Sequence, residues 1–284
     1  MKNMLKSLMH SSKGIIGLFL VLIIVLAAVL APVICKIDPN EKEIIARLKE
    51  PMTQTDSGTH FFGTDSLGRD VFSRTLYAAR MSLAVSLTAS LISLVIGCTV
   101  GLCSGYFGGK VDAVLSRISE IQLAFPFILL ALTVLAVLGN GMVQLICVMG
   151  LGSWVSYARI AREEAMTIRK LEYVDAAKVM GLSSFRILLR HLLPNIVSPI
   201  IVVTTFNIAS NVLTEASLSF LGLGVDVSMP SWGSMLADSK SYVISGEAWW
   251  CYVIPGVATM ITVLGINLLG DWLRDFLNPR LKTY

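Results

Sequence analysis

A line of polar residues interrupts the apolar run Asn195–Ala216. Asn207, Asn211 and Glu215 recur every four residues, and Thr204 extends the line inward. Because helical residues four apart share a face, these side chains form one stripe. An ionised side chain at the middle of a membrane helix costs about 2.5–3.5 kcal/mol on insertion scales, and such residues usually carry function. The stripe predicts the lining of a translocation path, with hydrogen bonding between helices as the alternative.

The rest of the chain shows no pattern of catalytic or metal-ligating residues. The nearest match to a phosphate-binding loop, GYFGGK at residues 105–110, has Ser104 where the first glycine is needed and Val111 where a Ser or Thr is needed. The histidines are far apart, at His10, His60 and His191. The cysteines have neither metal nor redox spacing: Cys35, Cys98, Cys103, Cys147 and Cys251. We therefore expect no catalytic residue, metal or cofactor on this chain.

The composition predicts an all-α integral membrane protein. Hydrophobic residues make up 55% and charged residues 15% of the 284 positions, whereas soluble domains carry about 25% charged residues. Roughly 20 apolar residues in a helix span the hydrocarbon layer. About six runs approach this length: Gly14–Ile34, Met81–Phe107, Ile121–Leu138, Gly141–Tyr157, Asn195–Ala216 and Cys251–Leu269. The first is too long for a signal-peptide core, so we read it as an uncleaved membrane helix.

The distribution of Lys and Arg predicts the orientation of the spans. The N-terminal tail, residues 158–194 and the C-terminal tail are rich in basic residues, and six spans place all three on one side. By the positive-inside rule that side is the cytoplasm. We expect a multi-pass protein of the plasma (inner) membrane with both termini cytoplasmic. The net charge of +4 is small and its basic residues flank the apolar runs, so no nucleic-acid partner is expected.

Three glycines in the second run predict close helix packing. Gly97, Gly101 and Gly105 form two overlapping GxxxG patterns. Small residues at this spacing let two helix backbones approach each other in a membrane. The pattern indicates tight packing within the chain or against a partner, and it carries no information about a substrate.

The polar stretch 159–195 predicts a helix, a bend and a second helix outside the membrane. Gly181 fits a helix C-terminal cap, Ser183 or Ser184 fits the N-terminal cap of the next helix, and Pro194 ends it. Small and apolar residues at the bend suit insertion into a groove on another protein. From the residues alone, a solvated amphipathic loop that folds back on the membrane is an equal alternative.

The same stretch resembles the EAA loop of ABC importer permeases. Asp175-Ala176-Ala177 is followed after three residues by Gly181 and, nine residues later, by HLLP. Asp175 replaces the Glu of the motif and His191 replaces its Ile. Four further segments resemble signatures of the C-type permease subunit of oligopeptide, dipeptide and nickel importers: FGTDSLGRDVFSR (62–74), LSFLGLG (218–224), PSWGSML (230–236) and NLLGDWLRDFLNPR (267–280).

This resemblance implies a type I ABC importer permease fold with a cytoplasmic coupling helix that docks on an ATPase subunit. The residues it assigns to coupling are Glu172, Asp175, Ala176, Ala177, Gly181, Leu182 and Ser183. It further implies a homologous second permease subunit as heterodimer partner, two ATPase subunits that carry ATP and Mg, an extracytoplasmic substrate-binding protein, and contact with membrane lipid. The implied cargo is a di- or oligopeptide, nickel or a metal-chelate complex.

We divide the chain accordingly into three parts. Residues 1–80 hold the N-terminal tail, the first span and an extracytoplasmic segment, residues 81–275 hold a five-helix transporter core with the EAA loop at 159–195, and residues 276–284 form a cytoplasmic tail. A self-contained secondary transporter or channel is the main competing hypothesis. It predicts internal repeats and broken helices, and no clear repeat is present. A membrane enzyme is a third hypothesis, which no residue constellation supports.

Overall fold

The computed structural model describes residues 2–225 and 228–277, and the side chains from residue 6 onward. Within these ranges, five helical segments are long and apolar enough to cross a membrane. They are α2 (Ser12–Ile34), α3 (Val71–Phe107), α6 (Met142–Ile168), the continuous segment Ser184–Phe220 and α12 (Trp250–Leu277). The fourth segment consists of α8 (Ser184–Ile187), a π-helical turn (Leu188–Leu192) and α9 (Leu193–Phe220).

The third run expected to span the membrane, Ile121–Leu138, is not a single helix in the structure. The structure has two helices there, α4 (Gly109–Ala124) and α5 (Phe127–Leu138), bent by 84°. Pro126 causes the break, because a residue that precedes proline is driven out of the helical region. Phe125 accordingly has extended backbone angles of φ −101° and ψ 131°. The described residues thus hold five candidate spans, or six if the bent pair crosses as one.

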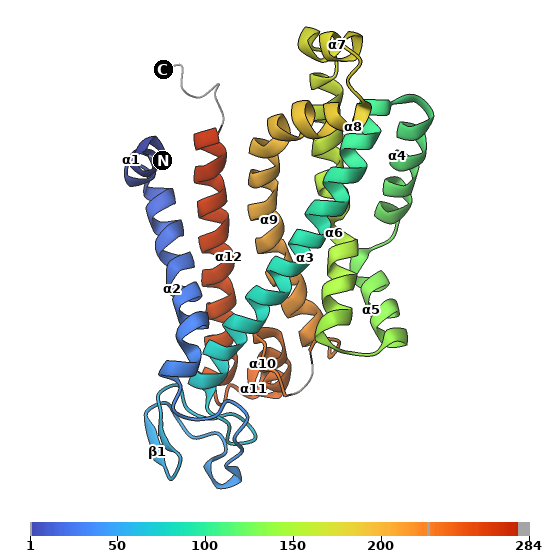
Figure 1. The fold of residues 1–284 in the computed structure, drawn as a ribbon. Helices are drawn as coiled ribbons and strands as arrows, with labels where there is room; N and C mark the ends of the chain where they lie inside the picture. The colour runs from blue at the N-terminus through green and yellow to red at the C-terminus, as the bar shows by residue number, and fades with distance from the viewer. Residues whose placement is uncertain (1, 226–227, 278–284) are drawn as a thin grey trace.

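The remaining elements are short and lie at the ends of the bundle. They are α1 (Lys2–Met9), a 3₁₀ turn (Ile44–Ala46), β1 (Thr53–Thr55), β2 (Gly58–His60), α7 (Glu172–Val179), α10 (Trp232–Asp238) and α11 (Lys240–Ser245). The strands form an antiparallel hairpin with Thr53 opposite His60. α1, α7 and the last turns of α12 lie at one end of the molecule, and the hairpin, α10 and α11 lie at the other (Figure 1).

This arrangement brings together the segments that the Lys/Arg pattern assigned to one side. The end with α1 and α7 corresponds to the expected cytoplasmic side, and we call the opposite end the external end. Which end faces the cytoplasm stays a prediction. Residues 278–284 of the expected cytoplasmic tail lie outside the described part of the chain.

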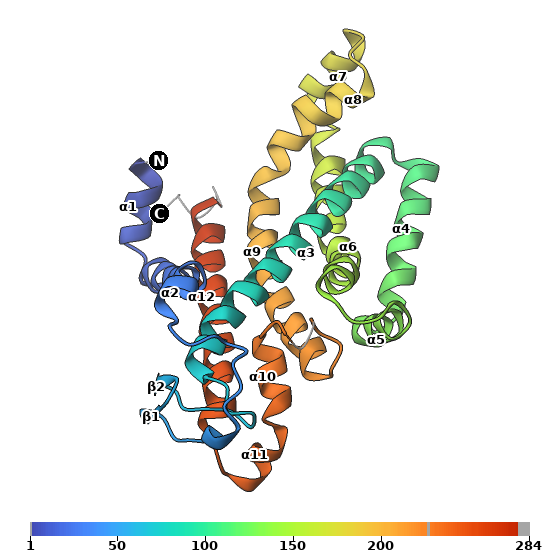
Figure 2. The same ribbon diagram turned by 60° about the horizontal axis from the view of Figure 1, so that its bottom comes forward.

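α3 is the central helix of the bundle. It crosses the molecule diagonally and contacts α6, α9 and α2, while α2 and α12 pair beside it (Figure 1). α4 lies at the opposite edge of the bundle from α2 (Figure 2). α3 begins at Val71, ten residues before the expected Met81, because Asp70 caps it by accepting a hydrogen bond from the Ser73 backbone. The boundary set at residue 80 therefore falls inside this helix.

The three glycines of the second run lie on the contact between α3 and α6. A Cβ built on Gly97, Gly101 or Gly105 would stand 2.4–2.5 Å from a backbone oxygen of α6. Real Cβ atoms essentially never approach an atom so closely. The absence of a side chain at these positions thus lets the two backbones touch, and the close packing occurs inside this chain.

Candidate functional site

The bend after α7 has the capping geometry that the sequence predicts. Gly181 has a φ of +78°, in the left-handed region that favours glycine. The Leu182 N–H donates to Ala177 O at 3.1 Å and the Gly181 N–H to Lys178 O at 2.9 Å. These bonds close the helix as a glycine C-cap does. Ser183 stands at the N-cap position of α8, but its hydroxyl makes no capping bond.

The bend presents apolar side chains to the surroundings. Val179, Met180 and Phe185 are 89%, 79% and 70% exposed, and we call these three residues the tip surface. Among the residues assigned to coupling, Glu172, Asp175, Ala176, Gly181 and Ser183 are also exposed. Large apolar side chains exposed together outside a membrane indicate a docking surface for another protein.

The buried face of α7, opposite the tip surface, packs against other parts of the chain. Val174 and Ala177 are buried in one cluster with Ile187 and Leu188, and Leu182 packs against it. Ala177, which the motif assigned to coupling, therefore faces the interior, because a small side chain is needed where α7 lies on α8. The tip is held in place by packing within this chain.

The polar stripe of α9 divides into two parts. Asn211 and Glu215 are buried against other helices, whereas Thr204 and Asn207 are half-buried. The Ser82 hydroxyl donates to Glu215 Oε2 at 2.7 Å, and the Ser219 hydroxyl donates to Glu215 Oε1 at 2.7 Å. In this structure Glu215 thus joins α9 to α3.

Asn211 makes the same kind of connection one turn away. Its Nδ2 donates to the Ser90 hydroxyl of α3 at 2.8 Å, and its Oδ1 accepts from Ser153 of α6 at 3.2 Å. For Asn211 and Glu215 the structure shows interhelical hydrogen bonding, the alternative to path lining, because α3 and α6 cover this part of the face. The Thr204 hydroxyl and Asn207 Nδ2 donate to carbonyls of their own helix, Ile200 O and Val203 O. Path lining by the stripe stays a prediction for all four residues.

A row of serines on α3 includes two partners of the stripe, Ser82 and Ser90, and sequence reasoning missed it. Its members are spaced at three or four residues and are buried: Ser82, Ser86, Ser90 and Ser93. The Ser86 hydroxyl has no hydrogen-bond partner among the described residues. The spacing of small polar residues in an apolar run was a visible signal, since such residues hold membrane helices together.

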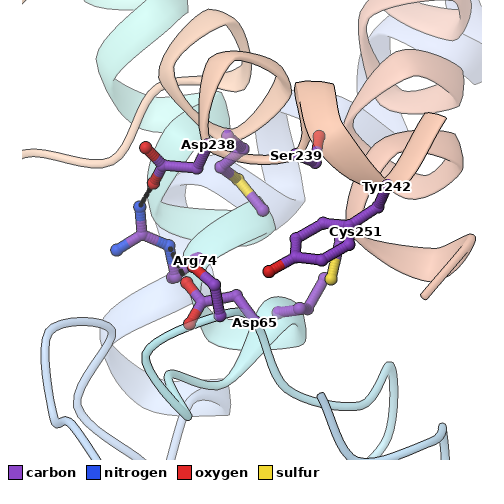
Figure 3. Close-up of a pocket in the computed structure, with 9 residues that line it drawn as sticks. Asp65, Arg74, Asp238, Ser239, Tyr242 and Cys251 are labelled. Carbon is purple, nitrogen blue, oxygen red and sulfur yellow. Dashed lines mark ion pairs between the residues drawn. The ribbon is translucent and has the colours of Figure 1, made fainter. Parts of the chain in front are cut away.

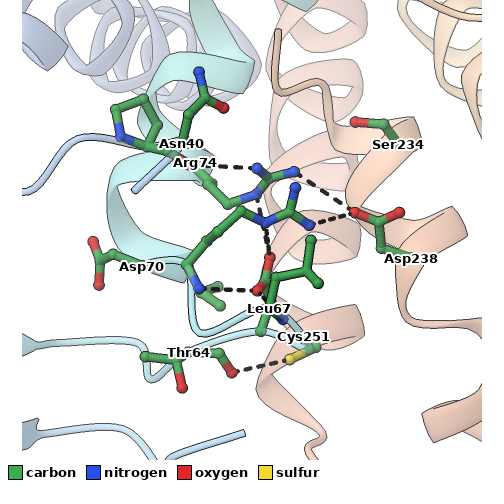
Figure 4. A network of polar contacts seen from close by, with 12 residues as sticks. Asn40, Thr64, Leu67, Asp70, Arg74, Ser234, Asp238 and Cys251 are labelled. Atoms are coloured by element: carbon green, nitrogen blue, oxygen red, sulfur yellow. Dashed lines mark hydrogen bonds and ion pairs between the residues drawn. The ribbon is translucent and has the colours of Figure 1, made fainter. Parts of the chain in front are cut away.

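Two signature segments of the sequence meet at the external end. Arg69 Nε donates to Asp65 Oδ2 at 2.6 Å, and its Nη2 donates to Asp238 Oδ2 at 2.7 Å. The guanidinium of Arg74 lies 3.6 Å from Asp65 and 3.7 Å from Asp238 (Figure 3, Figure 4). Both arginines are buried and Asp238 is half-exposed. Two arginines and two carboxylates thus tie α10 to the start of α3.

Neighbouring contacts strengthen this external core. Trp232 Nε1 donates to Thr75 O at 3.2 Å, and Trp250 Nε1 donates to Thr64 O at 3.0 Å. Cys251 also lies against Thr64 (Figure 4). Sequence reasoning did not foresee these contacts, because the partners are more than 150 positions apart.

A second polar chain fixes the hairpin. Ser57 and Thr55 donate to Glu43 Oε2 at 2.6 and 2.8 Å, and these bonds hold the pKa of Glu43 below its ordinary value. The buried ring of His60 bridges Thr55 at 2.9 Å and Asp70 at 2.9 Å. The hairpin is thereby connected to the residue that caps α3.

Two family models match the chain. Residues 93–283 match the "Binding-protein-dependent transport system inner membrane component", and residues 1–51 match the "N-terminal TM domain of oligopeptide transport permease C". The chain belongs to the family of binding-protein-dependent transport system inner-membrane components. The first match covers the bend, the polar stripe and α10, so these three features lie within the region that the family model describes.

Several similar permease proteins align with most of this chain. The putative peptide transport system permease protein of Brucella suis biovar 1 (strain 1330) is 42% identical over 98% of this chain and 91% of its own length. The di/tripeptide transport system permease protein of Pseudomonas aeruginosa (strain UCBPP-PA14) is 37% identical over 100% and 93%. The glutathione transport system permease protein of Pectobacterium atrosepticum (strain SCRI 1043) is 41% identical over 82% and 76%.

Solved structures show the fold that this permease component shares. A chain of the MetNI methionine ABC transporter in an inward-facing conformation matches with a TM-score of 0.56 and 21% identity, over 70% of this chain and 93% of that chain. An amino acid ABC transporter with histidines matches with a TM-score of 0.52 and 14% identity, over 72% and 94%. The permease fold expected from the sequence is confirmed.

Family membership also settles the general class of the protein. It is a multi-pass inner-membrane permease subunit of an ABC importer and is not itself the ATPase. An ATPase and a binding protein are implied as partners. The secondary-transporter, channel and enzyme hypotheses are thereby set aside.

Proposed function

We propose that this permease subunit forms half of the path through which a di- or oligopeptide enters the cell, and that it docks on an ATPase through the tip surface. A homologous second permease subunit supplies the other half. Two ATPase subunits bind ATP and Mg, and an extracytoplasmic binding protein delivers the cargo. Both termini and the tip lie in the cytoplasm.

The exposed tip surface is the observation that carries the coupling part of the proposal. Three large apolar side chains stand free of the rest of the chain on a bend that is itself firmly packed. Such a surface is stable in water only when a partner covers it. A rigid support is what the transmission of motion from an ATPase to the spans requires. The continuous helix from Ser184 to Phe220 leads from the tip directly into the membrane.

The similar proteins favour the peptide cargo. Those named above are peptide, di/tripeptide and glutathione permeases. No observation on this chain favours the nickel or metal-chelate cargo that the signatures also allow, so we take a peptide as the transported substrate.

The coupling proposal is tested by changing the tip without disturbing its support. In the double variant Val179→Glu/Met180→Glu, both changed side chains are on the exposed face. We expect the variant to insert normally but to retain at least tenfold less ATPase subunit in a purified complex, because two carboxylates would be buried in an apolar contact.

A matched control is available at the external end. Ile244 is 90% exposed and lies on α11, so Ile244→Glu makes the same chemical change away from the tip. We expect this variant to retain the ATPase at the wild-type level. Equal retention by the tip variant and the wild type would contradict the proposal.

A further inference from the structure

A cavity of about 710 Å³ opens at the external end of α2. Its walls come from the end of α2 and the residues after it, from the hairpin turn, and from the first turn of α3. The lining residues used below are Ile34, Lys36, Ile37, Phe61, Phe62 and Phe72. We call this site the Phe cavity.

Three phenylalanine rings give the Phe cavity an aromatic wall. The ring centroid of Phe72 lies 5.5 Å from that of Phe61 and 5.1 Å from that of Phe62, both in edge-to-face contact. Phe61 is half-exposed. The apolar part of the lining, which is these three rings with Ile34 and Ile37, favours an apolar occupant, because removing apolar surface from water is favourable.

The cavity lies beside the ends of two spans, at the boundary of the membrane. Ile34 is the last residue of the α2 span, and Phe72 is the second residue of the α3 span. On α2, Val29, Leu30 and Val33 are exposed, and they continue the apolar surface from the membrane to the cavity mouth. An acyl chain that lies along α2 therefore reaches the Phe cavity without crossing water.

The charge of the lining selects the head group. Lys36 stands two residues beyond α2 and has no hydrogen bond or ion pair with any described residue. The acidic lining residue, Asp70, is already committed, because its carboxylate accepts from His60 at 2.9 Å and from the Ser73 backbone at 2.7 Å. The cavity thus combines an apolar wall with one unpaired ammonium group.

We propose that the Phe cavity binds a membrane phospholipid with an anionic head group, with an acyl chain against the three rings and the head-group phosphate at Lys36. A lysine beside the end of a span is well placed to attract an anionic head group. The hairpin wall is held by the Glu43, Thr55 and His60 contacts described above, so the site is formed before the lipid arrives. This inference is independent of the proposed peptide cargo and of the ATPase contact.

The test measures which lipid the assembled transporter keeps. The complete complex is purified from bilayers that contain equal amounts of phosphatidylglycerol and phosphatidylcholine, and the retained lipid is counted by native mass spectrometry. We expect the wild type to retain phosphatidylglycerol preferentially. Lys36→Gln should lower that preference by about fivefold, as expected for the loss of one basic contact with an anionic lipid.

Three further variants make the result specific. Lys36→Arg keeps the charge and should keep the preference. Lys42→Gln removes an exposed lysine that does not line the cavity and should leave the preference unchanged. Phe61→Gln alters a half-exposed ring and should reduce retention of both lipids.

Equal retention of the two lipids by the wild type, or an unchanged preference in Lys36→Gln, would overturn the proposal. A separate variant, Phe61→Cys, tests the other occupant: a cross-link from this cysteine to the second permease subunit, with no lipid retained, would also overturn the proposal, because protein would then cover the cavity.

Discussion

Two buried polar residues of α9 join this helix to its neighbours. Glu215 accepts two serine hydroxyls, one from α3 and one from its own helix, and Asn211 bridges α3 and α6. A buried carboxylate or amide in a membrane must find such partners, since lipid offers none. Thr204 and Asn207 form the half-buried part of the stripe, and path lining by the stripe stays a prediction.

Replacing Glu215 should therefore affect stability. Glu215→Ala leaves the hydroxyls of Ser82 and Ser219 without their acceptor in a buried site. We expect a loss of about 1–2 kcal/mol in the free energy of unfolding, measured in detergent, because interhelical hydrogen bonds in membranes contribute on this scale. Asn207→Ala removes only a bond within its own helix and should cost clearly less. Equal losses in the two variants would contradict the assignment of Glu215 to helix packing.

At the scale of elements, close approach and ion pairing position the helices. α3 touches α6 along three glycines, and Arg69 and Arg74 tie the start of α3 to Asp238 on α10. The first contact depends on shape and the second on charge. Both act on α3, which also carries the serines that face α9.

Two helical glycines, Gly101 and Gly256, differ in how much space a side chain would have. A Cβ on Gly101 would stand 2.4 Å from Ala158 O, whereas a Cβ on Gly256 would meet nothing within 4 Å. Gly101→Ala should separate α3 from α6 and lower the thermal unfolding temperature of the purified subunit by several degrees. Gly256→Ala should be neutral or slightly stabilising, because alanine favours a helix by about 1 kcal/mol over glycine. A Gly101→Ala variant as stable as the wild type would show that this contact is not tight.

Removing one carboxylate from the ion pairs at the external end should lower the free energy of unfolding only moderately. Asp238→Asn leaves two buried guanidinium groups with Asp65 as their remaining carboxylate partner. We expect a loss of about 1–2 kcal/mol in unfolding free energy, less than for a fully buried pair, since Asp238 is half-exposed and solvent screens its charge. Asp56→Asn, at an exposed carboxylate of the hairpin turn, is the control and should change stability little. If the two variants behave alike, the network does not hold α10 in place.

The extent to which the sequence predicts this structure depends on how local each feature is. The cap at Gly181 is visible in the sequence because a left-handed helix end is set by a few neighbouring residues. The start of α3 and the bend at Pro126 are also local, and Asp70 and Pro126 are sufficient signals in retrospect. The burial of Glu215 and the pairing of Arg69 with Asp238 depend on which distant helix covers a face, and no local pattern specifies that.

At the scale of the whole molecule, the two ends of the bundle have different structures. The external end is a small packed unit of the hairpin, α10 and the start of α3, and the opposite end carries the tip surface on a continuous helix. We propose that cargo delivery acts on the first end and ATP-driven motion on the second. We therefore expect ATP to drive uptake, without a direct need for a proton or sodium gradient.

The most direct measurement is peptide uptake into liposomes that contain the complete transporter, with the binding protein and ATP supplied on their proper sides. For the wild type we predict uptake that requires both ATP and the binding protein. For Val179→Glu/Met180→Glu we predict uptake reduced at least tenfold. The control Ile244→Glu should retain an amount of ATPase close to that of the wild type. Uptake driven by a proton or sodium gradient without ATP, or wild-type uptake by the tip variant, would contradict the central claim.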